Sequence, residues 1–396
     1  MSKLDPPSLL APAANAPAAS SAGISPFPLR VVVLGAGKIG RTIAAMLHDS
    51  GDYRVTLVDR DPAQLQGLPE GIAVGARALD RAQDCAALLR GADAVLNALP
   101  FHAAVGVATV AASLGVHYFD LTEDVAATHA ICALAVGARS VLMPQCGLAP
   151  GFIGVVGNEL AQRFLRGGGE LLALKMRVGA LPRFPSNALK YNLTWSTEGL
   201  INEYCNPCEA IVDGRLIEVP AMEEREEFSL DGVTYEAFNT SGGLGTLCET
   251  LAGKVRTLNY RTIRYPGHAA IMKTLLNDLN LRNRRDLLKD ILEQALPATG
   301  QDVVIVFVTV SGLKGGRLMQ ETYAHKIYSG LIAGRPRSAI QITTAAGICA
   351  VLDLLAEGKL PQTGFVRQED IAFPDFLANR FGRHYAADAA AHGAAA

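Results

Sequence analysis

The chain has 396 residues, of which 49% are hydrophobic, so it is long enough to bury a sizeable core in two or three domains. Its 36 basic and 38 acidic residues give a net charge of −2, and no basic block indicates a nucleic-acid or anionic membrane partner. We therefore expect small molecules as ligands.

The two ends of the chain differ in composition from the rest. Residues 1–28 are rich in Ala, Pro and Ser, and prolines flank their only strong apolar pair, which favours a disordered tail over a signal peptide. Residues 386–396 are mostly Ala and predict a second disordered tail. We expect no apolar run of the length, about 18 residues, that crosses a bilayer. We expect a cytoplasmic protein without membrane contact.

The seven cysteines are scattered along the chain, and their odd number suits free thiols in a reducing compartment. Cys205-Asn-Pro-Cys208 has the spacing of a redox pair or of half a zinc site, or holds two ordinary cysteines in a turn. Because no second pair of this spacing completes a set of four ligands, we expect no metal.

A glycine-spaced turn follows the first apolar run, residues 29–34. Gly35 allows the tight turn, Gly37 allows close approach of a pyrophosphate, and Gly40 allows the next helix to pack on its strand. A helix over 41–49 would present its N-terminal N–H groups to the phosphates. The pattern predicts a dinucleotide site, with a phosphate-free βαβ unit as the alternative.

Asp59 follows a second strand, 54–58, and lies at the usual spacing from the glycines for a carboxylate that binds the adenosine ribose. It favours NAD, because the carboxylate would repel a 2′-phosphate. Arg60 could pair with that phosphate or lie over the adenine, so NADP stays possible.

Strand-like and helical segments then alternate, which predicts an α/β fold with a doubly wound parallel Rossmann sheet over residues 29–150. The expected strands are 72–79, 94–99, 116–121 and 140–143, and the expected helices are 81–90, 103–114 and 125–138. Ligands of such sheets bind outside the carboxyl ends of the strands. The residues expected there are Gly35 to Gly40, Asp59, Arg60, Asp80, 97–102, 120–124 and 145–151.

From about residue 152 the pattern changes, and runs of strands predict a second, α+β domain over 151–336 with a mainly antiparallel open sheet, for substrate binding and dimerisation. Its expected helices are 152–165, 267–279 and 283–295, its expected strands and loops are 171–182, 190–196, 210–238 and 256–265, and further strands are expected over 302–311 and 317–329. A long apolar helix over 338–357 predicts that residues 337–385 return to the first domain and complete it.

Several separate segments resemble the saccharopine dehydrogenase family, whose members include glutamate-forming saccharopine reductases and L-lysine 6-dehydrogenases. The segments are Val33-Leu-Gly-Ala-Gly-Lys-Ile-Gly40, Asn97-Ala-Leu-Pro100, Gly147-Leu-Ala-Pro-Gly151, Leu193-Thr-Trp-Ser-Thr-Glu-Gly-Leu200, Ser241-Gly-Gly243 and Thr262-Ile-Arg-Tyr-Pro-Gly-His268. Three segments of the second domain look closer to lysine 6-dehydrogenase. They are Asn202-Glu-Tyr204, Glu236-Ala-Phe-Asn-Thr-Ser-Gly-Gly243 and Tyr265-Pro-Gly-His268.

This resemblance implies an oxidoreductase that oxidises the side-chain amine of lysine with a nicotinamide cofactor and releases ammonia and 2-aminoadipate 6-semialdehyde. It also implies a homo-oligomer, either a dimer or a tetramer. Saccharopine reductase is the nearest alternative, and polyamine-forming relatives are a weaker one. A non-catalytic NAD(P)-binding redox sensor would need no polar pocket in the second domain.

The expected cofactor site uses the glycine loop and the strand ends of the first domain. Its residues are Gly35, Gly37, Lys38, Ile39, Gly40, Asp59, Arg60, Asp80, Asn97, Ala98, Leu99, Pro100, Gly147 and Leu148. In the second domain Arg264 can grip a substrate carboxylate through two parallel bonds, or form a structural salt bridge. His268 can transfer protons near neutrality, or cap and pack as most histidines do.

Four further residues are candidates for the reacting end of the substrate. Asp120 or Glu123, after the fifth strand, can act as the carboxylate base that amine oxidation needs, or cap the following helix. Trp195 and Tyr191 can pack on the aliphatic stem of the substrate, or belong to the core. Glu198 can hold a substrate ammonium, or begin a helix as an exposed acid.

Overall fold

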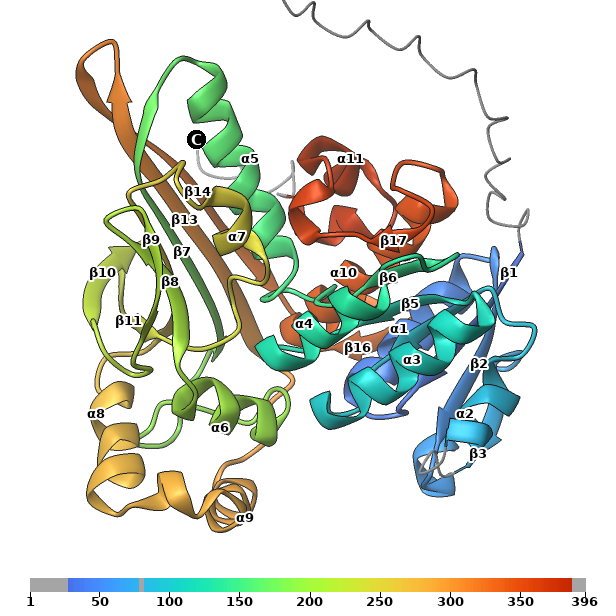
Figure 1. The fold of residues 1–396 in the computed structure, drawn as a ribbon. Helices are drawn as coiled ribbons and strands as arrows, with labels where there is room; N and C mark the ends of the chain where they lie inside the picture. Colours follow the sequence, from blue (N-terminus) through green and yellow to red (C-terminus); the bar gives the residue numbers. More distant parts are fainter. Residues whose placement is uncertain (1–27, 78–81, 387–396) are drawn as a thin grey trace, which may run out of the picture.

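Two β-sheets with helices on their faces lie side by side in the computed structural model, which describes residues 28–77 and 82–386 (Figure 1). The predicted tails fall almost wholly outside these residues. Within them, the first sheet has seven parallel strands in the order β17-β6-β5-β4-β1-β2-β3. These strands are β1 (Leu29–Leu34), β2 (Tyr53–Asp59), β3 (Ala73–Ala76), β4 (Ala94–Asn97), β5 (His117–Asp120), β6 (Val141–Met143) and β17 (Gly364–Phe365).

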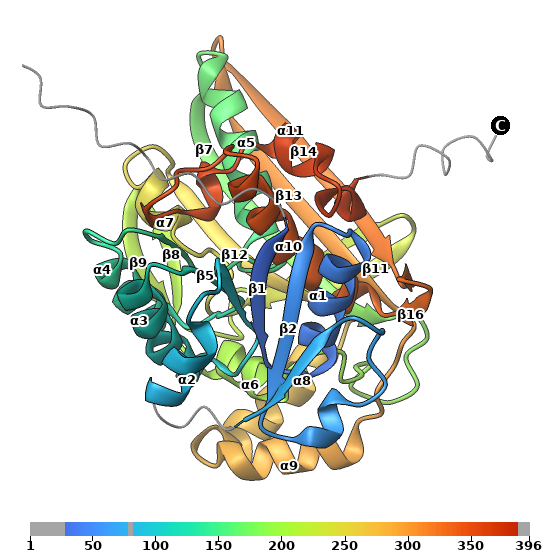
Figure 2. The same cartoon turned by 90° about the vertical axis from the view of Figure 1, so that its right-hand side faces the viewer.

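Helices cover both faces of this sheet, as Figure 2 shows. They are α1 (Lys38–Asp49), α2 (Ala82–Leu89), α3 (Ala104–Leu114), α4 (Val125–Leu134) and α10 (Ala339–Ala356). Alternate residues of β1 enter two different cores: Val31 and Val33 pack with α1 and α10, whereas Val32 and Leu34 pack with α2 to α4. This double burial explains why the strand is a continuous apolar run. The predicted Rossmann fold is confirmed.

The second sheet has the main order β10-β11-β12-β7-β13-β14, with β8 and β9 attached beside β12. Only β12 and β7 pair in parallel, and the other pairs are antiparallel. Its strands are β7 (Glu170–Pro182), β8 (Cys208–Val212), β9 (Arg215–Val219), β10 (Glu226–Leu230), β11 (Val233–Asn239), β12 (Thr257–Arg264), β13 (Asp302–Lys314) and β14 (Arg317–Tyr328). The expected mainly antiparallel sheet is confirmed.

The remaining elements pack around this sheet, with α5 along one face (Figure 1). They are α5 (Phe152–Arg166), α6 (Thr197–Cys205), α7 (Leu247–Leu251), α8 (His268–Lys273), α9 (Arg285–Ala295), α11 (Phe373–Ala378) and a small hairpin of β15 (Gly330–Ile332) and β16 (Arg335–Arg337). The segment 190–196, which was expected among the strands and loops, makes only an isolated bridge at Leu193. The span 210–238 is divided among four strands.

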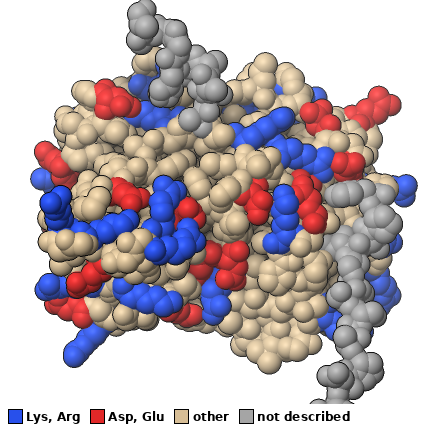
Figure 3. Space-filling view, turned by 90° about the horizontal axis from the view of Figure 1, so that it is seen from above, with Lys and Arg blue, Asp and Glu red and all other residues tan. Residues whose placement is uncertain are grey.

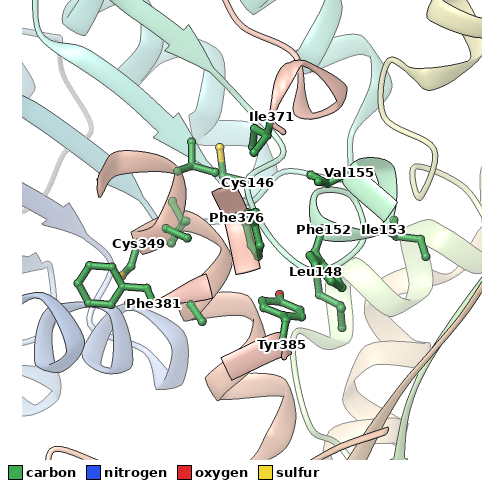
Figure 4. Close-up of a cluster of buried hydrophobic side chains, with 14 of the residues drawn as sticks. Cys146, Leu148, Phe152, Ile153, Val155, Cys349, Ile371, Phe376, Phe381 and Tyr385 are labelled. Atoms are coloured by element: carbon green, nitrogen blue, oxygen red, sulfur yellow. The ribbon is translucent and has the colours of Figure 1, made fainter. Parts of the chain in front are cut away.

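The C-terminal segment returns to the first sheet. Strand β17 pairs with β6, and α10 packs against α1. A cluster of buried side chains from α5, α10, α11 and the last turn joins these parts (Figure 4), and its rings of Phe152 and Tyr385 stack with centroids 4.0 Å apart. This cluster fixes the start of α5, directly after the segment 147–151.

Helix α10 also corrects one expectation. It is long and apolar enough, by length and composition, to cross a membrane, although no such run was expected. In the fold 83% of its apolar stretch is buried, as in the core helix of a globular protein. On the face seen in Figure 3, basic and acidic side chains are interspersed, as the small net charge predicts.

Candidate functional site

The glycine loop has the shape of a phosphate cradle. A Cβ on Gly35 would lie 2.8 Å from the carbonyl oxygen of Ala98, and one on Gly40 would overlap the carbonyl oxygen of Gly35. Both positions are therefore closed by the protein itself. A Cβ on Gly37 would meet nothing within 4 Å, so protein packing does not require glycine there. The open space lies at the N-terminus of α1, where a pyrophosphate would bind. The loop fits the predicted dinucleotide.

Asp59, at the end of β2, is tied to this loop. Its Oδ2 accepts a hydrogen bond from the backbone N–H of Ala36 at 2.7 Å, and its Oδ1 accepts one from the N–H of Asp61 at 2.9 Å. The carboxylate thus braces the loop at the position expected for the adenosine ribose. Arg60 is exposed beside it. Asp80 lies outside the described residues.

Asn97 shapes the next strand end. Its buried amide accepts a hydrogen bond from the N–H of Leu99 at 3.2 Å and donates one to the hydroxyl of Tyr118 at 3.3 Å. The segment that it holds, Ala98 to Pro100, lines a cavity together with Ile39 and the segment 147–150. The predicted cofactor residues on these strand ends therefore meet at one opening.

This cavity has a volume of about 260 Å³ and extends from the first sheet to the second domain. Its wall in the second domain includes residues of β7, α6 and β12. Among the described residues that line it, the charged ones are Glu123, Glu198, Glu203 and Arg264. Three carboxyl groups thus face one guanidinium, which is the charge pattern expected for a ligand with more ammonium than carboxylate groups.

Of the two candidate bases after β5, only Glu123 lines the cavity. Asp120 is buried, and it accepts hydrogen bonds from the hydroxyl of Tyr118 and from the N–H groups of Thr122 and Gln145. These bonds hold the loops after β5 and β6. Asp120 therefore shapes the site, and its predicted catalytic role is replaced by a positioning role.

Glu123 has the environment of a general base. Loss of hydration in the cavity raises the pKa of its carboxyl to about 7, and the nearby charges of Asp124 and Asp120 act in the same direction. The carboxyl lies against Gly199 of α6, where a Cβ would come within 3.3 Å of Oε1. A pKa near neutrality suits proton transfer at physiological pH.

Arg264 is 3% exposed at the end of β12, and a row of hydrogen bonds fixes its side chain. Its Nε donates to the hydroxyl of Tyr204 at 2.9 Å, and Nη1 donates to the carbonyl of Ile263 at 2.8 Å. The guanidinium carbon lies 4.9 Å from the ring centre of Tyr191. The Nη2 atom makes no hydrogen bond or ion pair with a described residue, so this nitrogen of the guanidinium is available to a ligand.

His268 stands behind Arg264 and is not among the described residues that line the cavity. Its Nδ1 lies 2.9 Å from the carbonyl oxygen of Leu189, which can only accept, so Nδ1 carries the proton. Its Nε2 then accepts from the Tyr204 hydroxyl at 3.0 Å. Burial, with the charge of Arg264, lowers the pKa of His268 to about 3. The prediction of proton transfer near neutrality is therefore wrong; neutral His268 orients Tyr204.

Of the other predicted substrate residues, Trp195 and Glu198 line the cavity, whereas Tyr191 lies behind its lining. Trp195 lines the cavity and donates from Nε1 to the hydroxyl of Tyr191 at 3.1 Å. Tyr191 is buried beneath Arg264 and supports it instead of lining the cavity. Glu198 lines the cavity, but its carboxylate pairs with Lys289 of α9 at 2.6 Å. Lys289 therefore already neutralises the carboxylate that was predicted to hold a substrate ammonium.

Glu203 was not among the predicted site residues. It lies on α6, lines the cavity and is 6% exposed. Burial raises the pKa of its carboxyl to about 8, while the charge of Arg264 lowers it and that of Glu123 raises it further. Its carboxyl makes no hydrogen bond or ion pair with another described residue. A charged residue within the otherwise apolar run around Leu200 and Tyr204 was the signal that the sequence offered.

Two family descriptions match separate parts of this chain. The description "Saccharopine dehydrogenase NADP binding domain" fits residues 31–140, and "Saccharopine dehydrogenase C-terminal domain" fits residues 147–383. These two ranges cover the described parts of both domains, including the glycine loop, Glu123, Glu203 and Arg264.

A solved structure supports the fold. Apo saccharopine dehydrogenase (L-Glu forming) from Saccharomyces cerevisiae is 17% identical, with a TM-score of 0.73 over 88% of this chain and 96% of that one. The DAP dehydrogenase of C. glutamicum is 11% identical, with a TM-score of 0.47 over 88% and 95%. Since the two family descriptions fit most of the sequence, the chain belongs to the saccharopine dehydrogenase family, as an oxidoreductase of amino acids that binds a nicotinamide dinucleotide.

Proposed function

We propose that the protein oxidises the side-chain amine of L-lysine with NAD as the preferred cofactor, and releases ammonia and 2-aminoadipate 6-semialdehyde. The observation that carries the proposal is the charge of the cavity. Arg264 is the one cation among the described lining residues, and two glutamates without an ion pair to a described residue, Glu123 and Glu203, accompany it, while Glu198 is paired with Lys289. Lysine has one carboxylate and two ammonium groups. Saccharopine has three carboxylates, so its binding would need a second cationic clamp.

In the proposed reaction Arg264 binds the substrate carboxylate, and Trp195 packs on the aliphatic stem. Glu123 takes a proton from the side-chain ammonium, because the amine must be neutral before its carbon is oxidised. The bound nicotinamide supplies the oxidation by accepting a hydride from that carbon. After this proton has passed to solvent, Glu123 accepts a proton from the water that adds to the resulting imine and returns it to the nitrogen, and the carbon–nitrogen bond breaks to give the aldehyde and ammonia. The aldehyde can close to a cyclic piperideine carboxylate.

Asp59 supports NAD, because a carboxylate at the end of the second strand, braced against the glycine loop, would repel a 2′-phosphate, although Arg60 beside it would suit NADP. A redox sensor without catalysis is the second candidate, but it has no use for a cavity that contains an arginine whose Nη2 bonds to no described residue and two glutamates, Glu123 and Glu203, that form no ion pair with one. We also propose a cytoplasmic homo-oligomer, on the strength of the family resemblance.

The test is turnover of lysine, saccharopine and diamines with NAD and with NADP. Ammonia release from lysine with NAD, in the absence of any 2-oxo acid, is the expected result. Turnover of saccharopine without ammonia release from lysine would replace the proposal with saccharopine reductase. Tight binding of the cofactor without turnover of any of these amines would favour the sensor.

A further inference from the structure

The buried carboxyl of Glu203 is costly to ionise in the free protein. A carboxyl that is 6% exposed and has no hydrogen bond or ion pair with a described residue is costly to ionise. Its raised pKa, to about 8, expresses that cost. Because the group lines the cavity, a cation that enters the cavity would remove the cost. Glu198 differs in this respect, since Lys289 already pairs with it.

The position of Glu203 indicates which group of the substrate supplies this cation. Glu203 and Arg264 line the same cavity, and Tyr204, which directly follows Glu203 on α6, accepts a hydrogen bond from Nε of Arg264 at 2.9 Å. The two charged side chains therefore belong to adjoining parts of the cavity wall. In an α-amino acid the carboxylate and the ammonium are attached to the same carbon, so their two receptors must be neighbours. Arg264 and Glu203 meet this requirement.

We propose that Glu203 binds the α-ammonium group of the substrate, and that the site thereby selects amino acids whose α-amino group is free and charged. The proposal rests on the proposed function for the identity of the substrate. Arg264 binds the carboxylate, Glu203 binds the adjacent ammonium, and Glu123 remains for the side-chain amine. Helix α6 supplies both Glu203 and Tyr204, so one helix places the ammonium receptor and orients the carboxylate clamp.

The experiment compares lysine with 6-aminohexanoate, which keeps the carboxylate and the reacting amine but lacks the α-amino group. Binding is measured by calorimetry on the full-length protein with NADH, which cannot accept a hydride, and turnover is measured with NAD. We expect Glu203→Gln to weaken lysine binding by about 10- to 100-fold, the range for loss of a charge-assisted pair, and to change 6-aminohexanoate binding by less than about 2-fold. The KM for lysine should rise more than kcat falls.

Glu198→Gln is the matched control, because it removes a lining carboxylate that Lys289 already neutralises. It should act on lysine and 6-aminohexanoate alike. Glu203→Asp keeps the charge on a shorter side chain and should recover part of the preference for lysine, and melting curves verify that each variant is folded.

Two outcomes would overturn the proposal. Equal losses for both ligands in Glu203→Gln would mean that Glu203 serves the reacting amine or the arginine, and no loss for either would mean that it contacts neither. A failure of the proposed function looks different. In that case neither ligand is oxidised by the wild type, while the binding comparison still tests Glu203.

Discussion

The hydroxyl of Tyr204 accepts a hydrogen bond from Nε of Arg264 at 2.9 Å and lies 3.0 Å from Nε2 of His268. Because Leu189 fixes the proton of His268 on Nδ1, the hydroxyl must donate to the histidine and accept from the arginine. The directions of all three bonds are thereby determined. The arginine is held at one edge, and its other edge faces the cavity.

Tyr204→Phe should loosen this clamp, because it leaves a buried guanidinium N–H and a buried imidazole nitrogen without partners. A loss of about 1 to 3 kcal/mol is expected, which is roughly 5- to 150-fold in the KM for the carboxylate substrate, with a smaller change in kcat. Tyr235→Phe, at a buried tyrosine of β11 outside this row, is the control. Steady-state kinetics with an unchanged KM for Tyr204→Phe would show that Arg264 needs no such support.

The glycine loop offers a matched pair of substitutions. Gly40→Ala should lower the melting temperature and impair cofactor binding, because its Cβ would overlap the carbonyl oxygen of Gly35. Gly37→Ala should leave the melting temperature within about 1 °C, since nothing lies within 4 Å of the added atom, yet it should weaken cofactor binding at least about 10-fold. Calorimetry and thermal melting separate the two effects. Normal cofactor affinity in Gly37→Ala would move the pyrophosphate elsewhere.

Asp59 has two functions that two substitutions can separate. Asp59→Asn keeps an oxygen that can accept from Ala36 but removes the charge, so it should shift the ratio of kcat/KM from NAD toward NADP by about 10-fold or more. Asp59→Ala also removes the brace of the loop and should weaken both cofactors. If Asp59→Asn leaves the ratio unchanged, the carboxylate does not meet the ribose.

Part of the fold was predictable from short sequence patterns. Two hairpin turns that were not predicted also have a recognisable sequence. The hairpin β8–β9 turns at Asp213-Gly214, and β10–β11 turns at Asp231-Gly232, all four residues having positive φ. Asp-Gly between strands is a strong hairpin signal, so the single expected span 210–238 could have been divided. The glycine loop was predictable because its glycines, the following helix and Asp59 occur at a characteristic spacing within one βαβ unit.

The site in the second domain was less accessible to such reasoning. Arg264, Tyr204 and His268 meet only because β12, α6 and α8 pack together, and the direction of their hydrogen bonds depends on Leu189, which lies 79 residues before His268 in the sequence. The sequence therefore identified His268 but could not exclude its protonation. Glu203 was overlooked because an acid in an apolar helix acquires meaning only when the cavity beside it is known.

The pH dependence of the reaction follows from Glu123. Burial holds its pKa near 7, above the ordinary range, so the carboxyl is protonated and inactive as a base at low pH. The kcat for lysine should therefore rise as the pH increases through about 7. Glu123→Gln should lower kcat by about 100-fold or more and remove this rise. A pH profile that persists in Glu123→Gln would assign the base to another group.

Arg264→Lys tests the clamp itself, and the same strand supplies its control. Lysine keeps the charge but loses the planar pair of donors, so the KM for the amino acid should rise by about 30- to 150-fold, equivalent to roughly 2 to 3 kcal/mol. Arg261 also lies on β12, but its guanidinium pairs with Glu224 and Glu226, and Arg261→Lys should change the KM by less than about 3-fold. If a second clamp shared the binding, as saccharopine would require, the Arg264 variant would retain part of its affinity. A KM that stays near the wild-type value in Arg264→Lys, measured with lysine and NAD, would remove Arg264 from the substrate site.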